Sequence, residues 1–274
     1  MTDSRSRNEW QERSKAWAAT APQGKSPDDS FNQMIIAEAA IKPGEDVLDI
    51  ATGGGNPAVS TALSMNGHGS VTCTDLTPRM LETTRGRAKT LSLSVMRYAA
   101  ADMRSLPFPD DIFDCVTCRF GIMFPDDKIA AASEARRVLK PGGRAAYVVW
   151  GPYDENPAFY VPRRAVASYF GDQEEPAPTR HSLSAPGTLK TILHSAGFAR
   201  TEERDLRYKN RVDDLDTYVS NGLKRSFAKK IDGMTEAEIN ALKQALFAAW
   251  EPFREDGVVQ VPNFARLGLG WKKT

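Results

Sequence analysis

The chain has 274 residues, of which 41% are hydrophobic, and its 36 Lys and Arg against 35 Asp and Glu give a formal net charge of +1. This is the composition of an ordinary globular protein, and it lacks the basic excess that many nucleic-acid binders carry. The longest wholly apolar runs, residues 145–150 and 245–250, are far too short to span a membrane. The first residues are charged and contain no signal-peptide core. We therefore expect a soluble, cytoplasmic protein without a membrane span or a nucleic-acid partner.

Short apolar strands alternate with helical stretches between residues 42 and 150. This alternation predicts an α/β fold, in which a mostly parallel sheet has helices on both faces. Cys115 and Cys118 form a C-x-x-C motif on a predicted strand, so they should point to opposite faces and share neither a metal nor a disulfide. The strands are predicted at 46–51, 70–75, 93–99, 113–120 and 144–150, and the helices near 57–66, 78–90 and 126–139.

The character of the sequence changes after Trp150. Aromatic residues are concentrated in 150–170, where prolines restrict regular structure in the first half and residues 163–170 are predicted to form a short helix. The remaining predicted elements are a helix near 186–196, a strand near 199–208, a helix that opens with the capping box of Thr235 and Glu238, and a strand at 264–271, which completes a seven-stranded sheet.

A glycine-rich loop, ATGGGNPA, joins the first predicted strand to a helix. Gly53-x-Gly55-x-x-Ala58, with Asp75 20 residues beyond Gly55, satisfies the dinucleotide fingerprint, so an NAD(P)-dependent oxidoreductase is one hypothesis. However, a pyrophosphate at a helix N-terminus requires positive potential, whereas Asp49 puts a carboxylate beside this turn. An acid there favours a ligand with positive charge, such as S-adenosylmethionine with its ammonium and sulfonium. Asp75 would accept hydrogen bonds from a ribose diol in either case.

Four strings in the first half of the chain carry a family resemblance. They are VLDIATGGGNPA (47–58), VTCTDLTPRML (71–81), LPFPDDIFD (106–114) and RVLKPGGR (137–144). Over roughly residues 44–150 the chain resembles class I S-adenosylmethionine-dependent methyltransferases, and within them the type 11 group that includes the ubiquinone and menaquinone C-methyltransferases. The resemblance implies their Rossmann-like fold with a helical substrate cover. Ala51 departs from the pattern, because many class I enzymes have a glycine there.

The resemblance also implies which residues bind the cofactor, S-adenosylmethionine, and no metal is expected. The methionine part would be wrapped by Asp49, Ala51, Gly53 and Gly55, while Gly54 and Arg119 fall where the quinone methyltransferases also contact the cofactor. The nucleoside part would be held by Asp75 at the ribose hydroxyls, Leu76 against adenine, Asp102 at the adenine amino group and Met103 beside the ring.

Ligands of open α/β sheets bind beyond the carboxyl ends of the strands. The cofactor would occupy the ends of the earlier strands, which leaves the fourth and fifth strand ends for a small, flat or apolar methyl acceptor. Of the 3 histidines, His181 is the candidate general base, and His68 and His194 are expected to face solvent. The pocket would be lined by Trp17, Phe120, Trp150, Tyr153, Phe159 and Tyr160.

We predict a single methyltransferase domain over 1–274. Its expected function is methyl transfer from S-adenosylmethionine to a small aromatic or apolar metabolite, at oxygen, carbon or nitrogen. Two alternatives stay open: the oxidoreductase, and a noncatalytic relative that only binds the cofactor. A homo-oligomer is compatible with the sequence. The segments are an N-terminal helical cap (1–41), a cofactor-binding core (42–150), a lid insertion (151–185) and a C-terminal completion of the sheet with a helical insertion (186–274).

Overall fold

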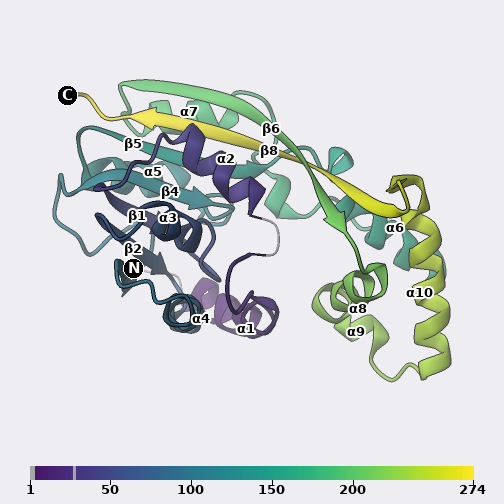
Figure 1. Ribbon diagram of the computed structural model, residues 1–274. Helices are drawn as coiled ribbons and strands as arrows, with labels where there is room; N and C mark the ends of the chain where they lie inside the picture. Colours follow the sequence, from purple (N-terminus) through teal and green to yellow (C-terminus); the bar gives the residue numbers. More distant parts are fainter. Residues whose placement is uncertain (1–3, 27–28) are drawn as a thin grey trace.

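The computed structural model describes residues 4–26 and 29–274. Its centre is a sheet with the strand order β3-β2-β1-β4-β5-β8-β6 (Figure 1). The pairs from β3 to β5 are parallel, and β8 runs antiparallel to both of its neighbours. The strands are β1 (Asp46–Ile50), β2 (Ser70–Asp75), β3 (Met96–Ala100), β4 (Phe113–Arg119), β5 (Leu139–Trp150), β6 (Arg200–Val212), β7 (Arg254–Glu255) and β8 (Val258–Trp271).

The predicted α/β fold with a mostly parallel sheet is confirmed, and the seven expected strands form its path. One short strand was not expected: β7 pairs with the start of β8. The helices are α1 (Ser4–Thr20), α2 (Ser30–Glu38), α3 (Ala58–Ser64), α4 (Pro78–Thr90), α5 (Lys128–Val138), α6 (Pro157–Phe170), α7 (Thr188–Ser195), α8 (Leu215–Ser226), α9 (Ala228–Ile231) and α10 (Glu236–Trp250), with short 3-10 turns at Tyr153–Glu155, Thr179–His181 and Glu251–Phe253.

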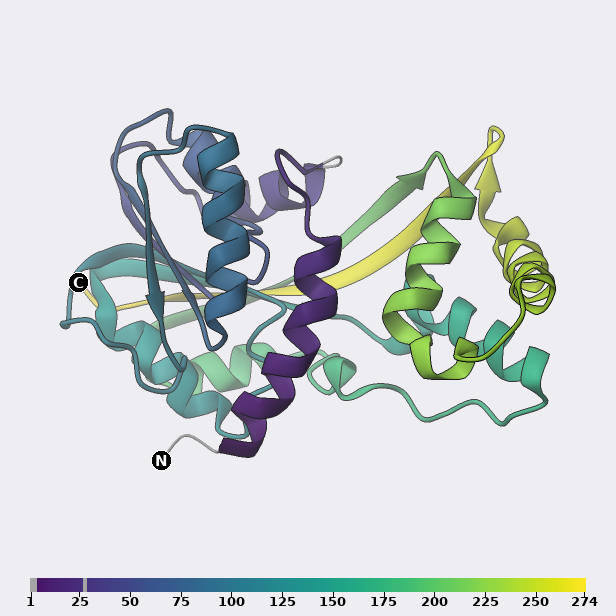
Figure 2. The same cartoon turned by 90° about the horizontal axis from the view of Figure 1, so that it is seen from below.

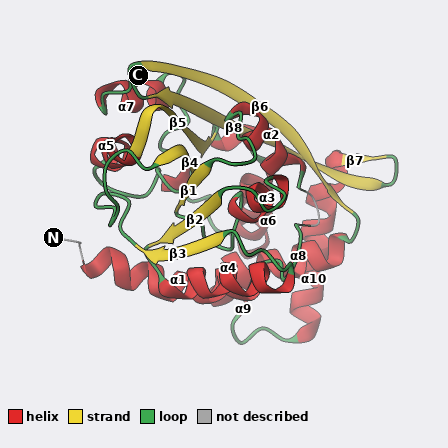
Figure 3. Cartoon of the chain, turned by 60° about the vertical axis from the view of Figure 1, so that its left-hand side comes forward, coloured by secondary structure: helices red, strands yellow, loops and turns green. Residues whose placement is uncertain are grey.

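Helices pack on both faces of the sheet (Figure 3). One hydrophobic cluster joins α5 and α7 to the sheet, and a second joins α2, α3 and α4 to its other face. Cys115 lies in the second cluster and Cys118 in the first, and both are buried free thiols. The prediction that they point to opposite faces is therefore confirmed, because side chains alternate along a strand.

Several predicted boundaries were wrong at the ends of elements. The helix α5 stops at Val138, so the Pro141-Gly142-Gly143 stretch lies within β5 rather than just after a helix. The strand β6 continues to Val212 and pairs with β8 from Arg200↔Trp271 to Val212↔Val259. Its length was underestimated because β6 is an edge strand, and its many exposed charged residues hide the apolar alternation.

A second, smaller body lies at the far ends of β6 and β8, and we call it the helical lobe (Figure 2). It consists of α6, α8, α9 and α10 with the adjoining ends of these two strands. Its own hydrophobic cluster includes Val161 and Val166 of α6, Leu242 and Trp250 of α10, and Val261 of β8. The helix α6 is longer than the short helix predicted at 163–170, because Pro157 occupies its first turn, where a proline is tolerated.

The capping box of α10 is present as predicted, with Thr235 and Glu238 each bonded to the other's backbone. No helix among the residues that the structure describes is long and apolar enough to cross a membrane.

Candidate functional site

The glycine-rich loop leaves β1 after Ile50 and leads into α3 with an unusual backbone. Ala51, Gly53 and Gly55 have φ values of 55°, 53° and 91°. A Cβ on Gly55 would lie 2.9 Å from Cγ2 of Val59, so only glycine fits there. The Ala51 methyl group is accommodated from across the loop, because a Cβ on Gly121 would come within 2.6 Å of it. The departure at Ala51 is thus matched by a glycine that follows β4.

Asp49 is buried below this loop, with only 1% of its surface exposed. Its Oδ1 accepts a 2.6 Å hydrogen bond from the Thr117 hydroxyl, but its Oδ2 is buried and has no partner. Burial raises the pKa of Asp49 to about 6, and the neighbouring hydroxyls of Thr117 and Thr52 and the nearby Arg119 act in the opposite direction. A buried carboxylate oxygen without a hydrogen-bond partner destabilises the folded protein. The Asp49 Oδ2 therefore indicates a binding place for a positively charged or hydrogen-donating ligand.

Asp75 ends β2 and is held in one orientation. Its Oδ2 accepts from the Gly53 amide at 3.0 Å, and its Oδ1 accepts from the Thr77 amide at 2.9 Å and the Thr77 hydroxyl at 2.8 Å. Burial raises the pKa of Asp75, and these hydrogen bonds partly offset that effect. Each carboxylate oxygen has two lone pairs, so the group can still accept from a ligand. The carboxylate also ties the glycine loop to the end of β2.

A cavity of about 310 Å³ opens beside the ends of β2 and β3. Leu76 and Asp102 line this cavity, whereas Met103 packs against the hydrophobic core. The Asp102 carboxylate accepts from the Arg104 backbone amide at 2.9 Å and from its guanidinium at 2.8 Å, so a ligand would share this acid with Arg104. The full lining is Gln11, Leu76, Pro78, Ala100, Ala101, Asp102, Ser105 and Pro107.

Arg119 closes the other side of the site at the end of β4. Its guanidinium donates to Asn32 Oδ1 at 3.1 Å and lies 5.0 Å from the Phe31 ring centre, and its buried Nε has no partner. Burial lowers the pKa of Arg119, while the Asp49 carboxylate favours its charged form. Arg119 and Asp49 thus offer a ligand one charge of each sign.

A row of aromatic rings leads from this point towards the helical lobe. Phe120 stacks on Trp150 with ring centres 3.9 Å apart and an interplanar angle of 6°. Trp150 meets Phe159 edge-on at 4.9 Å, and Tyr153 lies 6.3 Å from Tyr160. The structure therefore brings together these predicted pocket residues.

Trp17 is not part of this row. Its side chain is 45% exposed and its ring lies 5.7 Å from the guanidinium carbon of Arg225 in α8. Two rings that the sequence did not single out extend the row at its other end, because Phe31 lies 5.8 Å from Phe120 and 4.1 Å from Tyr208.

His181 lies within the aromatic row and is only 6% exposed. Its ring is 4.9 Å from that of Phe159 and 5.4 Å from that of Tyr153. Nδ1 is 2.8 Å from the Gly151 carbonyl oxygen, which can only accept, so Nδ1 carries the proton. Nε2 is buried without a partner, and burial lowers the pKa of the ring. His68 and His194 are exposed, as expected.

Arg87 supports the glycine loop, and the sequence analysis missed it. Although it is an arginine on a helix, it is 1% exposed, and it donates to the carbonyl oxygens of Gly24 at 3.0 Å and of Gly54, and to Asn56 Oδ1 at 3.2 Å. Its helical spacing from the buried Met80 and Thr84 was the available signal, because residues three or four apart share a helix face.

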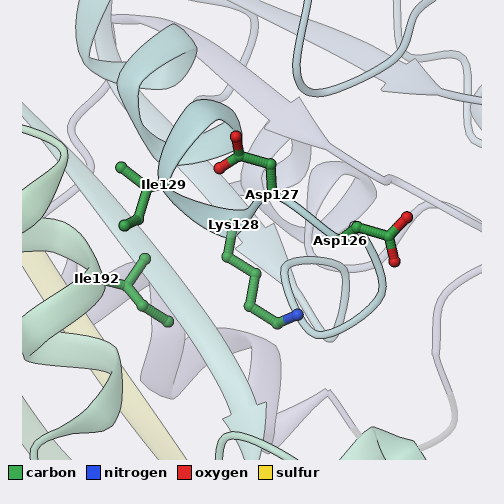
Figure 4. Close-up of a pocket in the computed structure, with 5 residues that line it drawn as sticks. All are labelled: Asp126, Asp127, Lys128, Ile129 and Ile192. Carbon is green, nitrogen blue, oxygen red and sulfur yellow. The ribbon is translucent and has the colours of Figure 1, made fainter.

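A larger hollow of about 530 Å³ lies between α5 and α7, away from the predicted residues (Figure 4). Its lining residues are Asp126, Asp127, Lys128, Ile129 and Ile192. Asp127 accepts from the Ala130 amide as a helix cap, and Lys128 donates to the Pro125 carbonyl. Asp127 and Lys128 thus already have partners within the protein, and the site at the strand ends is the better candidate.

Comparison with known proteins identifies the family of this chain. A model described as the ubiE/COQ5 methyltransferase family matches residues 28–157. The ubiquinone/menaquinone biosynthesis C-methyltransferase of Ralstonia pickettii is 34% identical over 185 residues, which cover 63% of this chain and 74% of that protein. The chain belongs to the ubiE/COQ5 methyltransferase family. Its cofactor is accordingly S-adenosylmethionine, as the loop and acid pattern predicted.

Other relatives of this chain match over a smaller share of their own length. An uncharacterised protein of Mycobacterium tuberculosis is 41% identical over 120 residues, and the chain covers 41% of it; for the Cupriavidus taiwanensis quinone methyltransferase the share is 53%. Among solved structures, YcgJ of Bacillus subtilis is 21% identical with a TM-score of 0.55, and the alignment covers 90% of this chain and 100% of that one. That likeness supports the class I fold.

Proposed function

We propose that this protein transfers a methyl group from S-adenosylmethionine to a small, flat or apolar acceptor. The observation that carries the proposal is the unpartnered, buried Oδ2 of Asp49 at the start of a glycine loop. The Gly53 amide of that loop is bonded to Asp75, and the next residue, Leu76, lines a cavity of about 310 Å³. A cationic methionine group suits Asp49, and the same acid disfavours the pyrophosphate of a dinucleotide. The oxidoreductase alternative therefore has the weaker physical basis.

The predicted cofactor residues fit the parts of S-adenosylmethionine. When bound, it supplies a methyl carbon made electrophilic by the sulfonium. Asp49 and Arg119 would face the ammonium and carboxylate of the methionine part, with Ala51, Gly53, Gly54 and Gly55 around it. Asp75 would hold the ribose diol, while Leu76 and Asp102 would contact adenine and Met103 would support the ring from behind.

The acceptor is proposed to lie against Phe120 and Trp150, with Tyr153, Phe159 and Tyr160 as the outer part of its pocket. These rings contact one another in a row that begins at the end of β4. Several relatives carry the name of quinone C-methyltransferases, so a quinone-like ring is one acceptor of the right shape. The family model ends at residue 157, so Phe120, Trp150 and Tyr153 lie within the matched range and Phe159 and Tyr160 lie beyond it. The noncatalytic alternative would leave these rings without a ligand.

Calorimetry with S-adenosylhomocysteine and with NAD tests this function. We expect S-adenosylhomocysteine to bind and NAD to give no heat. Asp75→Ala should weaken S-adenosylhomocysteine binding at least about tenfold, because the ribose hydroxyls lose charge-assisted hydrogen bonds of about 1.5–3 kcal/mol each. The matched control is Asp213→Ala, which removes an exposed acid paired with Arg211 and should leave affinity unchanged. Binding of NAD without binding of S-adenosylhomocysteine would overturn the assignment.

A further inference from the structure

Residues from three separate segments surround the imidazole of His181. Gly151 follows β5 and accepts from Nδ1, Tyr153 belongs to the next turn, and Phe159 comes from α6. The Phe159 ring touches Trp150, which stacks on Phe120 directly after Arg119. His181 therefore belongs to the same continuous row of side chains as the proposed acceptor pocket.

Two features of this histidine are unusual for a residue with a purely structural role. The Gly151 carbonyl fixes the tautomer, so the lone pair is on Nε2. That nitrogen is buried with no partner in the protein, which leaves an acceptor unsatisfied at a cost of about 1–3 kcal/mol. A ligand that donates a proton or hydrogen bond to Nε2 would remove this cost.

We propose that His181 is the general base of the reaction and that the acceptor is an aromatic or enolic hydroxyl compound. This inference rests on the proposed methyl transfer and specifies its acceptor. An arene hydroxyl carries the proton that Nε2 lacks, and its ring matches the stacked and edge-on rings of the pocket. An amine presents its own lone pair to the methyl carbon, and an acidic thiol is already ionised, so neither requires this base.

The step balances with groups that are already named. His181 Nε2 takes the hydroxyl proton while an oxygen lone pair forms the new bond to the methyl carbon. The carbon–sulfur bond breaks, and its electron pair stays on sulfur. The imidazolium, stabilised at Nδ1 by the Gly151 carbonyl, then releases its proton to water when the pocket opens. No oxidant or reductant is consumed.

The charged groups around His181 favour its neutral form. Arg180 on its own turn and Arg163 of α6 both lower the pKa of His181, in addition to burial. Glu174, which accepts from the hydroxyl of the neighbouring Tyr153, is paired with Arg164. The base should therefore be unprotonated at neutral pH, as a general base must be.

Three naphthalene probes of nearly equal shape test the inference: 2-naphthol, 2-naphthylamine and 2-naphthalenethiol, each with S-adenosylmethionine at about pH 8. His181→Asn retains a donor for Gly151 but has no basic nitrogen. We expect it to lower the turnover of 2-naphthol at least about 100-fold and that of the amine and the ionised thiol less than about threefold. An equal loss with all three probes, no loss with 2-naphthol, or wild-type turnover of the amine or thiol alone would overturn the inference.

Ring nitrogen NMR of the S-adenosylhomocysteine complex gives a second readout that needs no turnover, with the exposed His68 and His194 as internal references. We expect His181 to be neutral at about pH 7 with its proton on Nδ1, and its Nε2 signal to move when 2-naphthol is added. A protonated ring, the other tautomer, or an unmoved signal would contradict the proposal. Calorimetry with S-adenosylhomocysteine separates this inference from the proposed function. If the wild type does not bind S-adenosylhomocysteine, the methyltransferase function is overturned. If it binds normally and the probe or NMR results contradict the proposal, only the role of His181 is overturned.

Discussion

The carboxylate of Asp49 has one oxygen bonded to Thr117 and one without a partner, and burial raises its pKa to about 6. The native protein therefore holds this proton more tightly than the unfolded chain, where an Asp has a pKa of about 3.9. As the pH rises from about 4 to 6, the unfolded chain releases this proton before the native protein does, so the free energy of unfolding falls. Above about pH 6 the native protein carries the full destabilisation from the buried charge. The shift corresponds to at most about 3 kcal/mol.

Asp49→Asn should therefore stabilise the protein without ligand and weaken ligand binding. At about pH 7.5 we expect urea denaturation to show a free energy of unfolding about 1–3 kcal/mol higher than that of the wild type, with little difference at about pH 4. S-adenosylhomocysteine affinity should fall at least about tenfold, because the ammonium loses its counter-charge. The control is Asp213→Asn, which removes an exposed acid. A variant that is less stable than the wild type at both pH values would show that Asp49 is a structural acid.

At the scale of elements, the helical lobe has a hydrophobic cluster that is separate from the two on the faces of the sheet. Leu242 on α10 and Leu193 on α7 are both 0% exposed, one in the lobe and the other beside the sheet. Truncation of either to Ala leaves a cavity that costs about 2–5 kcal/mol. The two substitutions should nevertheless have different consequences, because no proposed cofactor residue lies in the lobe.

We expect Leu242→Ala to speed hydrogen exchange in α8, α9 and α10 while β1 to β4 stay protected and S-adenosylhomocysteine affinity changes less than about threefold. In the matched variant Leu193→Ala, exchange should rise across the sheet instead. Loss of protection throughout the chain in both variants would mean that the lobe and the sheet unfold as one unit.

At the scale of the whole molecule, α1 runs along α4 and lies between the sheet and the helical lobe (Figure 2). Gln11 of α1 lines the cavity proposed for adenine, and Trp17 near the end of the helix contacts Arg225 of α8. Gln11, in the middle of α1, thus faces the cavity proposed for adenine, and the last turn of the helix, at Trp17, faces the lobe. These two contacts give the helix two separable roles.

Removal of residues 1–20 should weaken S-adenosylhomocysteine binding at least about tenfold, because the cavity loses a wall and a bound adenine would be left partly in water. Trp17→Ala should leave that affinity within about threefold and should raise hydrogen exchange in α8 instead. Calorimetry and exchange measured on both variants check this. If Trp17→Ala weakened binding as much as the truncation, the contact with the lobe would be part of the cofactor site.

The sequence alone predicted the strand and helix order of residues 46–150 and the acids at the strand ends, because these signals are local. The backbone of a glycine loop depends on the residues of the loop itself, and a buried strand is recognised from the few apolar residues that form it.

The tertiary structure decided the features that depend on partners distant in the sequence. Val161 of α6 and Trp250 of α10 share a cluster although many residues separate them, and β6 owes its length to its pairing with β8. Arg87 is buried where backbone carbonyls from other segments accept its hydrogen bonds, and the Gly151 carbonyl fixes the proton of His181 on Nδ1. Local sequence patterns do not indicate such contacts, because each contact forms only when the chain packs.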